Sequence, residues 1–186
     1  MPALSGQSIA ILATSGFEQS ELVQPKQLLT DAGATVHVIA PESGTIRGWD
    51  DGEWGKRVPV DVVLTDADPA DYAALVLPGG QINPDVLRLD GDAVDFVKAF
   101  ASAGKPIAAI CHAPWMVIEA GLAEGRTATS YESIRTDLAN AGATVVDRSV
   151  AVDTDGPFTL ITSRNPDDIP DFVGAVVDAL TESVAA

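Results

Sequence analysis

The sequence predicts an α/β protein with a mainly parallel central sheet covered by helices on both faces. Short apolar runs alternate with amphipathic segments from end to end, as in repeated βαβ units. The apolar runs are continuous, which is typical of strands buried on both faces. A third observation is that an Ala-Gly pair closes a predicted helix four times, where glycine can adopt the left-handed conformation that ends a helix. The pairs are Ala32-Gly33, Ala103-Gly104, Ala120-Gly121 and Ala141-Gly142.

Five apolar runs are the predicted main strands. They are residues 8–13, 35–40, 73–77, 106–110 and 158–162. The first helix is predicted over residues 21–32, where the missing amide of Pro25 should produce a kink or a late start.

The last helix is marked by Asn165 as its cap, with Pro166 at the first helical position. Apolar residues then follow at helical spacing, so we expect them to face the sheet. They are Ile169, Phe172, Val173, Val176 and Leu180.

Residues 44–63 depart from this pattern, because they are rich in turn-forming residues and predict a small hairpin or loop. Trp49 and Trp54 lie in this segment. They either pack locally and hold the loop down, or line a pocket mouth or a subunit contact.

The bulk composition fits one globular domain over residues 1–186, with 46% hydrophobic and 20% charged residues. Met1 to Gly6 hold neither a basic segment nor a long apolar run, and no stretch approaches the roughly 20 apolar residues of a membrane span. The single cysteine cannot form an internal disulfide, and cysteine and histidine do not cluster at metal-ligand spacing. We therefore expect a cytoplasmic protein without a metal or other cofactor.

The formal net charge of −16 and the pI near 4.1 count against nucleic acid and anionic lipid as partners, since binding either relies on clustered lysine and arginine. The acidity indicates a solvated surface, as in a salty cytoplasm, and by itself predicts no function.

Cys111 stands where the strand 106–110 should end and a helix through Ile118 should begin, between the small residues Ala109 and Ala113. This placement resembles a nucleophile elbow, in which small neighbours let the backbone turn sharply. A helix N-terminus there would stabilise the thiolate and lower the pKa of the cysteine. The alternative is an inert cysteine packed as a small hydrophobe.

Two further features should reach the same edge of the sheet. Gly79 and Gly80 directly follow the strand 73–77, and their amides are candidate oxyanion donors, although a Gly-Gly turn is also a common loop. Glu18 lies just beyond the first strand, where it is either a helix-capping carboxylate or part of a site.

Four segments together resemble the ThiJ/PfpI superfamily, in particular its PfpI-type intracellular protease branch of stress-protein and deglycase-like members. They are Phe17-Glu18 with Glu21-Leu22, the Leu75-Val76-Leu77-Pro78-Gly79-Gly80 turn, Ile110-Cys111-His112-Ala113-Pro114 and Thr162-Ser163-Arg164-Asn165-Pro166-Asp167-Asp168. The resemblance runs from about Ile9 to Leu180. It implies a flavodoxin-like three-layer sandwich of the kind found in class I glutamine amidotransferases. It also implies a nucleophile at Cys111, an acid at Glu18 that hydrogen-bonds the thiol, and a homodimer or higher homo-oligomer.

In that family the residue matching His112 acts with a carboxylate from an adjacent subunit, and Asp85 stands near that position after an apparent one-residue insertion. Residues adjacent in sequence at the start of a helix project in different directions, which argues against His112 reaching the sulfur of Cys111. Glu18 is then the better candidate for controlling the thiol, because a buried carboxyl stays protonated and can exchange protons with it.

A glutaminase of the same fold is a third possibility that the histidines exclude. That site needs a histidine downstream of the cysteine, and the sequence has none after His112. The other histidine, His37, lies within a predicted strand and is interpreted as structural.

Two functions follow from these residues. The first is a stress-related cysteine hydrolase, in which Cys111 attacks the carbonyl of a peptide bond, methylglyoxal or a glycation adduct, so that its partner is a small carbonyl compound or a peptide or protein. The second is a stress protein without catalysis, either an oxidant sensor using Cys111 or a holding chaperone. We expect the enzyme, because oxyanion donors and a proton-handling acid are superfluous for passive binding.

Overall fold

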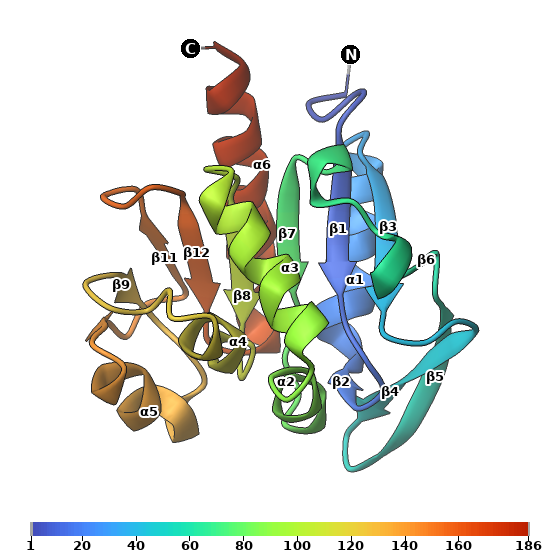
Figure 1. Cartoon of the computed structure of the whole chain (residues 1–186), viewed down its shortest axis with the longest axis horizontal. Helices are drawn as coiled ribbons and strands as arrows, with labels where there is room; N and C mark the ends of the chain where they lie inside the picture. The colour runs from blue at the N-terminus through green and yellow to red at the C-terminus, as the bar shows by residue number, and fades with distance from the viewer. Residues whose placement is uncertain (1, 186) are drawn as a thin grey trace.

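A seven-stranded sheet forms the centre of the computed structural model, which describes residues 2–185 (Figure 1). Its strand order is β11-β12-β8-β7-β1-β3-β6, and β11 is antiparallel to β12 whereas the other neighbours are parallel. The strands are β1 (Ser8–Leu12), β3 (Thr35–Ala40), β6 (Val62–Val63), β7 (Ala74–Leu77), β8 (Ile107–Ile110), β11 (Val150–Asp153) and β12 (Leu160–Ser163). The predicted α/β class and its five main strands are confirmed, with bounds shifted by two residues at most.

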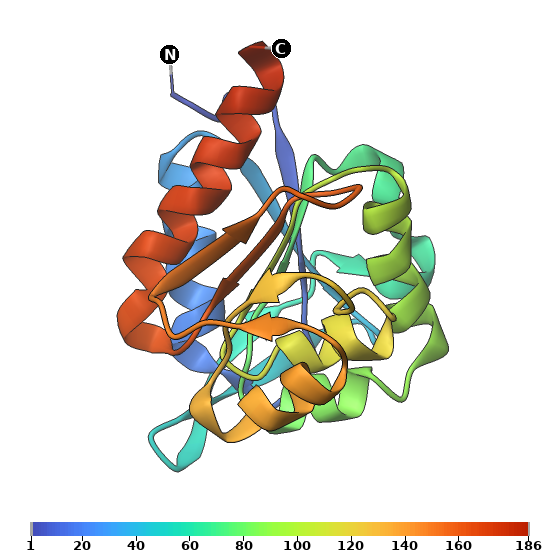
Figure 2. The same cartoon turned by 90° about the vertical axis from the view of Figure 1, so that its left-hand side faces the viewer.

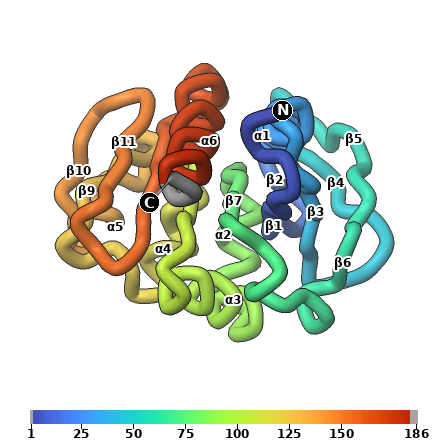
Figure 3. Tube along the Cα trace, turned by 90° about the horizontal axis from the view of Figure 1, so that it is seen from above, coloured from blue at the N-terminus to red at the C-terminus, as the bar shows by residue number. Residues whose placement is uncertain are grey.

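Helices cover both faces of this sheet and complete the predicted three layers (Figures 2 and 3). Helices α1 (Gln19–Asp31) and α6 (Ile169–Ala185) lie on one face, and α3 (Gly91–Ser102) and α4 (Pro114–Glu119) lie on the other. The short helices α2 (Ile82–Leu87) and α5 (Arg135–Asn140) lie near the carboxyl ends of the strands. Two separate hydrophobic clusters result, one on each face of the sheet.

The helix ends follow the sequence closely. In each of the four Ala-Gly pairs alanine is the C-cap and glycine has a positive φ, between 70° and 102°. Helix α1 starts at Gln19 and continues through Pro25, so the proline does not delay its start. The part of the chain that the structure describes also contains four 3₁₀ turns: η1 (Leu64–Asp66), η2 (Pro69–Asp71), η3 (Glu132–Ile134) and η4 (Pro166–Asp168).

Helix α6 begins later than predicted. Asn165 caps the 3₁₀ turn η4 by accepting a hydrogen bond from the N–H of Asp167 at 3.0 Å, and the α-helix follows from Ile169. The apolar face is as predicted, since Ile169, Phe172, Val173, Val176 and Leu180 are all buried.

The segment 44–63 forms the predicted hairpin at the carboxyl end of the sheet. Strands β4 (Thr45–Asp50) and β5 (Glu53–Pro59) are antiparallel, and the two-residue strand β2 (Phe17–Glu18) pairs with β4. Trp49 packs edge-on against Trp54, with ring centroids 5.3 Å apart. The pairing of β2 with β4 sets Glu18 beside Trp49, which brings the hairpin to the edge of the sheet where β1, β7 and β8 end.

The remaining elements form a small layer beside β12. Strands β9 (Thr127–Ala128) and β10 (Thr144–Val145) are parallel neighbours, and α5 lies between them in the sequence. Among the residues that the structure describes, no helix is both long and apolar enough to cross a membrane.

Candidate active site

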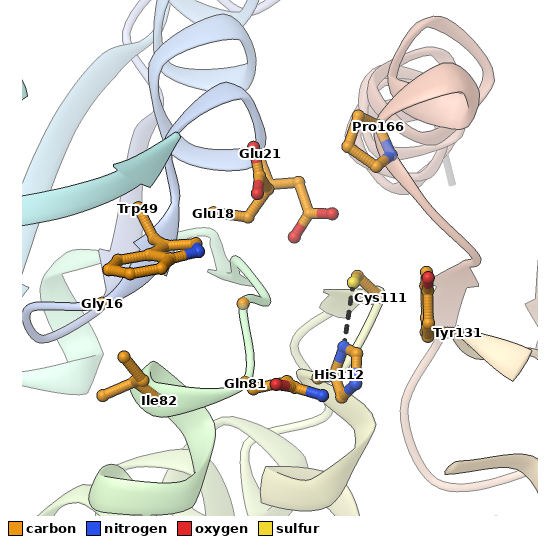
Figure 4. Close-up of a pocket in the computed structure, with 11 residues that line it drawn as sticks. Gly16, Glu18, Glu21, Trp49, Gln81, Ile82, Cys111, His112, Tyr131 and Pro166 are labelled. Atoms are coloured by element: carbon orange, nitrogen blue, oxygen red, sulfur yellow. Dashed lines mark hydrogen bonds between the residues drawn. The ribbon is translucent and has the colours of Figure 1, made fainter. Parts of the chain in front are cut away.

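A pocket of about 440 Å³ opens at the carboxyl ends of the central strands, where open α/β sheets bind ligands (Figure 4). It is lined by Gly16, Glu18, Glu21, Trp49, Gly80, Gln81, Ile82, Cys111, His112, Tyr131 and Pro166. Cys111, the candidate nucleophile, therefore lies in a cavity that can hold a ligand.

Cys111 has a strained backbone, with φ of 65° directly after the last residue of β8. A cysteine in this left-handed region costs of order 1–2 kcal/mol, so the surroundings must hold it there. They do so from both sides, because its N–H donates to the carbonyl of Ser163 and its carbonyl accepts from the N–H of Tyr131, each at 2.9 Å. Helix α4 follows from Pro114. The predicted nucleophile-elbow geometry is therefore present.

Gly79 supports the site by its lack of a side chain. A Cβ added there would lie 2.6 Å from Oε2 of Glu21, 2.7 Å from Cβ of Cys111 and 2.8 Å from the carbonyl oxygen of Ile110. The buried amide of Asn83 holds this turn by donating to the carbonyls of Pro78 and Gly79, at 2.8 and 3.3 Å. Glycine is therefore required at position 79, because Glu21, Cys111 and the end of β8 approach the backbone there too closely for any side chain.

The prediction that Gly79 supplies an oxyanion donor is wrong, because its N–H already donates to Oε2 of Glu21 at 2.8 Å. The N–H groups of Gly80 and His112 instead point at the sulfur of Cys111 and act to lower its pKa. Of the two predicted donors, only Gly80 is directed at the reacting atom.

The acid that interacts with the thiol is Glu21, not Glu18 as expected. The Glu21 side chain is fully buried and its carboxyl is hydrogen-bonded to Cys111. Glu18 caps helix α1, since its Oε1 accepts from the N–H and hydroxyl of Ser20 at 3.4 and 2.9 Å. It still lines the pocket, at the wall formed with Trp49. Glu18 is therefore both a helix-capping carboxylate and a residue that lines the pocket.

One signal in the sequence could have identified Glu21. Glu21, Pro25 and Leu29 follow one another at intervals of four residues, and all three are buried on one face of helix α1. A glutamate within an apolar helical stripe is a buried acid, and buried acids mark functional sites more often than exposed ones do.

Burial raises the pKa of Glu21 from its usual value to about 8, against the opposing effects of the Gly79 N–H and the Cys111 thiol. Burial, followed by the charge of Glu21, also raises the pKa of Cys111, and the N–H groups of Gly80 and His112 offset this only in part. The expectation that the helix end lowers the pKa of the thiol is therefore wrong. At neutral pH, both the acid and the thiol hold their protons.

His112 reaches the sulfur, contrary to the expectation from helical spacing. Its Nδ1 lies 3.1 Å from Sγ of Cys111, as the dashed line in Figure 4 marks. The directions expected of adjacent helical residues do not apply here, because the backbone of Cys111 is in the left-handed region and helix α4 begins only at Pro114. The imidazole stacks on the ring of Tyr131 at 4.8 Å, and its Nε2 lies 3.1 Å from Oγ of Ser133. Burial lowers the pKa of His112, so the neutral base is favoured at neutral pH.

The other predicted residues lie apart from the thiol. Asp85 is an exposed residue of α2 and pairs with Arg88 at 3.2 Å, so its role as an acid for an adjacent subunit stays a prediction. His37 is structural, as interpreted, with its Nδ1 3.1 Å from the hydroxyl of Tyr72. Among the described residues, histidine, cysteine and carboxylate side chains form no group of three or more suited to a metal ion.

The fold and the site define an α/β protein with an elbow cysteine, a neighbouring imidazole and a buried acid. Residues 7–179 match the DJ-1/PfpI family, and the chain belongs to that family.

Relatives match nearly the whole chain. It is 45% identical to General stress protein 18 of Bacillus subtilis over 168 residues, which are 90% of this chain and 94% of that protein. It is 41% identical to Protein/nucleic acid deglycase 2 of Escherichia coli over 167 residues, 89% of this chain and 93% of that protein.

A solved structure with the same fold is a two-domain protein from Anabaena variabilis that contains a DJ-1/ThiJ/PfpI-like and a ferritin-like domain. Its TM-score is 0.85 at 33% identity, and the match covers 94% of this chain and 48% of that one. The predicted superfamily and fold are confirmed.

Proposed function

We propose that this protein is a stress-related enzyme in which Cys111 attacks the carbonyl carbon of a small aldehyde or of a glycation adduct. One observation carries the proposal: the sulfur of a strained, pocket-lining cysteine lies 3.1 Å from a neutral imidazole nitrogen. A nucleophile beside a base, at a turn that exposes it, is the arrangement that covalent catalysis needs. The similarity to a general stress protein and to a deglycase supports a stress-related role.

The first step follows from the protonation states. The thiol of Cys111 transfers its proton to Nδ1 of His112 as Sγ bonds to the carbonyl carbon, and the π electrons of the carbonyl move to its oxygen. For an aldehyde, the imidazolium returns the proton to this oxygen and gives a hemithioacetal. In a dicarbonyl such as methylglyoxal, the hydrogen of this carbon then moves to the neighbouring carbonyl carbon through an enediol, so that the first carbon is oxidised to a thioester as the ketone is reduced to an alcohol. Water hydrolyses the thioester, which releases the 2-hydroxy acid and returns the thiol of Cys111. The N–H of Gly80 favours the negative charge that develops on the sulfur as the proton leaves.

The pocket favours a compact, uncharged or cationic substrate. Its walls include the rings of Trp49 and Tyr131 and the side chain of Ile82, and the described residues that line it include no lysine or arginine. A cavity of about 440 Å³ is at the small end of ligand sites, which suits a dicarbonyl or one modified side chain better than an extended peptide.

The test compares the wild type with Cys111→Ala in assays of methylglyoxal, a glycated amino acid and a peptide panel. We expect the wild type to consume the two carbonyl substrates faster than the peptides, and Cys111→Ala to lose this activity. Ser102→Ala, an exposed change at the end of α3, serves as the matched control. Equal rates for wild type and Cys111→Ala would refute the enzyme proposal.

A second candidate, the oxidant sensor, is favoured by the free oxygen of Glu21. Its Oε1 is buried, and no nitrogen or oxygen of the described residues hydrogen-bonds to it. A protonated Oε1 could donate to an oxygen added to the sulfur of Cys111 and stabilise the oxidised form. The raised pKa of the thiol acts in the opposite direction, because the thiolate is the form that peroxide attacks.

Mass spectrometry after graded peroxide tests the sensor. The protein has two methionines, and Met116 is buried. A sensor requires Cys111 to gain oxygen before either methionine does. Oxidation of methionine first would eliminate this candidate.

A further inference from the structure

We propose that Ser133 is a positioning residue that holds His112 in the tautomer able to accept the thiol proton, and that it connects the imidazole to solvent. The inference rests on the function proposed above and adds the residue that completes the proton path. The family resemblance implies a carboxylate of an adjacent subunit as the partner of His112, whereas in the structure a hydroxyl of the same chain lies 3.1 Å from its Nε2.

The direction of each hydrogen bond follows from the groups around the sulfur. The N–H groups of Gly80 and His112 both donate to Sγ of Cys111. Oε2 of Glu21 accepts from the N–H of Gly79, and burial raises the pKa of Glu21 to about 8, so its neutral carboxyl is a weak acceptor for the thiol proton at neutral pH. The thiol proton of Cys111 therefore needs a stronger base as its acceptor. Nδ1 of His112, at 3.1 Å, is that acceptor.

A neutral imidazole carries one N–H, so a bare Nδ1 requires the proton to be on Nε2. The Nε2–H then donates to Oγ of Ser133, and the Ser133 hydroxyl is free to donate to water because the residue is exposed. The chain of donors runs from Cys111 through His112 to Ser133. When Nδ1 takes the thiol proton, the imidazolium can give up the proton of Nε2 through Ser133 to solvent water.

The rest of the imidazole surface is enclosed by aromatic rings, which leaves Ser133 as its polar partner on this side. Tyr131 stacks on the ring at 4.8 Å with an interplanar angle of 26°, and Trp115 packs edge-on at 5.4 Å. The charged groups near this enclosure act on Trp115, because Arg88 lies over its ring and Asp137 accepts from its indole N–H. Cys111 and Tyr131 are the titratable groups that face the imidazole directly.

The first experiment reads the tautomer itself. The chain has two histidines, so long-range ¹H–¹⁵N spectra of the wild type and of His37→Gln assign the signals of His112 without ambiguity. We expect a protonated Nε2 and a bare Nδ1 in the resting protein at pH 7. A resting protein with the proton on Nδ1 overturns the proposal.

The second experiment measures alkylation of Cys111 by iodoacetamide, which needs no carbonyl substrate and reports one thiol because the chain has one cysteine. We expect Ser133→Ala to alkylate roughly tenfold more slowly at pH 7, because the imidazolium formed on proton transfer loses a charge-assisted hydrogen bond. The acid limb of the pH profile should move to lower pH. Ser133→Thr keeps the hydroxyl and should restore both the rate and the profile, and Ser102→Ala should match the wild type.

The outcomes separate this inference from the proposed function. If Ser133→Ala has the wild-type alkylation rate and pH profile, Ser133 has no positioning role. If only Asp85→Asn slows alkylation, the group that orients His112 belongs to an adjacent subunit, which also overturns the proposal. If the Ser133 variants change alkylation as expected while the wild type consumes no carbonyl compound, the proposed function fails and the positioning role stands. Far-UV circular dichroism and the unfolding midpoint check that Ser133→Ala is folded.

Discussion

The N–H of Gly79 donates to Oε2 of Glu21 at 2.8 Å, across a separation of 58 residues in the sequence. This bond fixes the buried acid against the turn that follows β7, on the side where the nucleophile lies. It also explains why Gly79 cannot serve as an oxyanion donor, since its one N–H has a partner.

Gly79→Ala should destabilise the protein by about 2–4 kcal/mol and abolish the reactivity of Cys111. The added Cβ would meet Glu21, Cys111 and backbone within 2.8 Å, and the backbone atoms cannot move aside. Urea unfolding and the alkylation rate measure the two effects. Gly174→Ala is the matched control, because a Cβ in this exposed turn of α6 meets nothing within 4 Å, so it should stabilise by about 0.5–1 kcal/mol. A Gly79→Ala protein as stable as the wild type would contradict the close packing around Gly79.

Glu21 should make the protein less stable as the pH rises. Its pKa is raised from 4.5 to about 8 in the folded state, so the neutral acid is favoured by folding and the charged form opposes it. The contribution is fully present below pH 4.5 and is lost as the pH rises through about 8, by a few kcal/mol in total. Unfolding free energies between pH 4.5 and 9 measure this slope.

The slope should be absent in Glu21→Gln, which is neutral at every pH, and retained in Glu119→Gln, a change at an exposed position of α4. If Glu21→Gln keeps the wild-type pH dependence, another group must be responsible.

Cys111→Gly should be more stable than Cys111→Ala by about 1 kcal/mol. Both variants lack the sulfur, but only glycine adopts a φ of 65° without strain. Thermal unfolding of the two variants side by side measures the difference, and a more stable alanine variant would show that the turn is not strained.

His112 should remain an effective base below pH 6.5. Burial lowers its pKa below that ordinary value, so protonation of the free imidazole, which stops it from accepting the thiol proton, occurs at more acid pH. The pH profile of Cys111 alkylation should therefore keep its plateau at pH 6.5 and fall below it. His112→Gln should be slow at all pH values and lack this limb. An acid limb centred above pH 6.5 would be inconsistent with the buried imidazole.

The fold was predictable because its signals are local. Each buried strand is a continuous apolar run, and each Ala-Gly pair needs only the conformational preference of glycine at a helix end. Cys111 was predictable for the same reason, since a strand end, small neighbours and a following helix are all read within a few residues. The hairpin that carries Trp49 and Trp54 was equally evident from its turn-forming residues.

The site partners were not predictable in the same way, because they depend on rotations and contacts between distant segments. Glu18 and Glu21 are less than one helical turn apart, and the residue at which α1 begins decides which of them faces the sheet. The reach of His112 depends on the positive φ of Cys111, which the sequence suggests only as a sharp turn. Ser133 meets His112 because the chain returns to the site after α4 and β9, and no local pattern marks that return.

The pocket is assembled from six separate segments of the chain, contributed by α1 and its approach, the β4 strand, the turn after β7, the elbow, the η3 approach and η4. Two of these segments directly follow the central strands β7 and β8, whereas the others come from elements around the carboxyl edge of the sheet, and such peripheral elements open at lower free energy than core strands. Mild heat or denaturant should therefore separate the segments that line the pocket while the central sheet stays folded and still gives a native circular dichroism signal. In a stored or heat-stressed preparation, the alkylation rate of the one thiol should therefore report loss of the site before the circular dichroism spectrum changes.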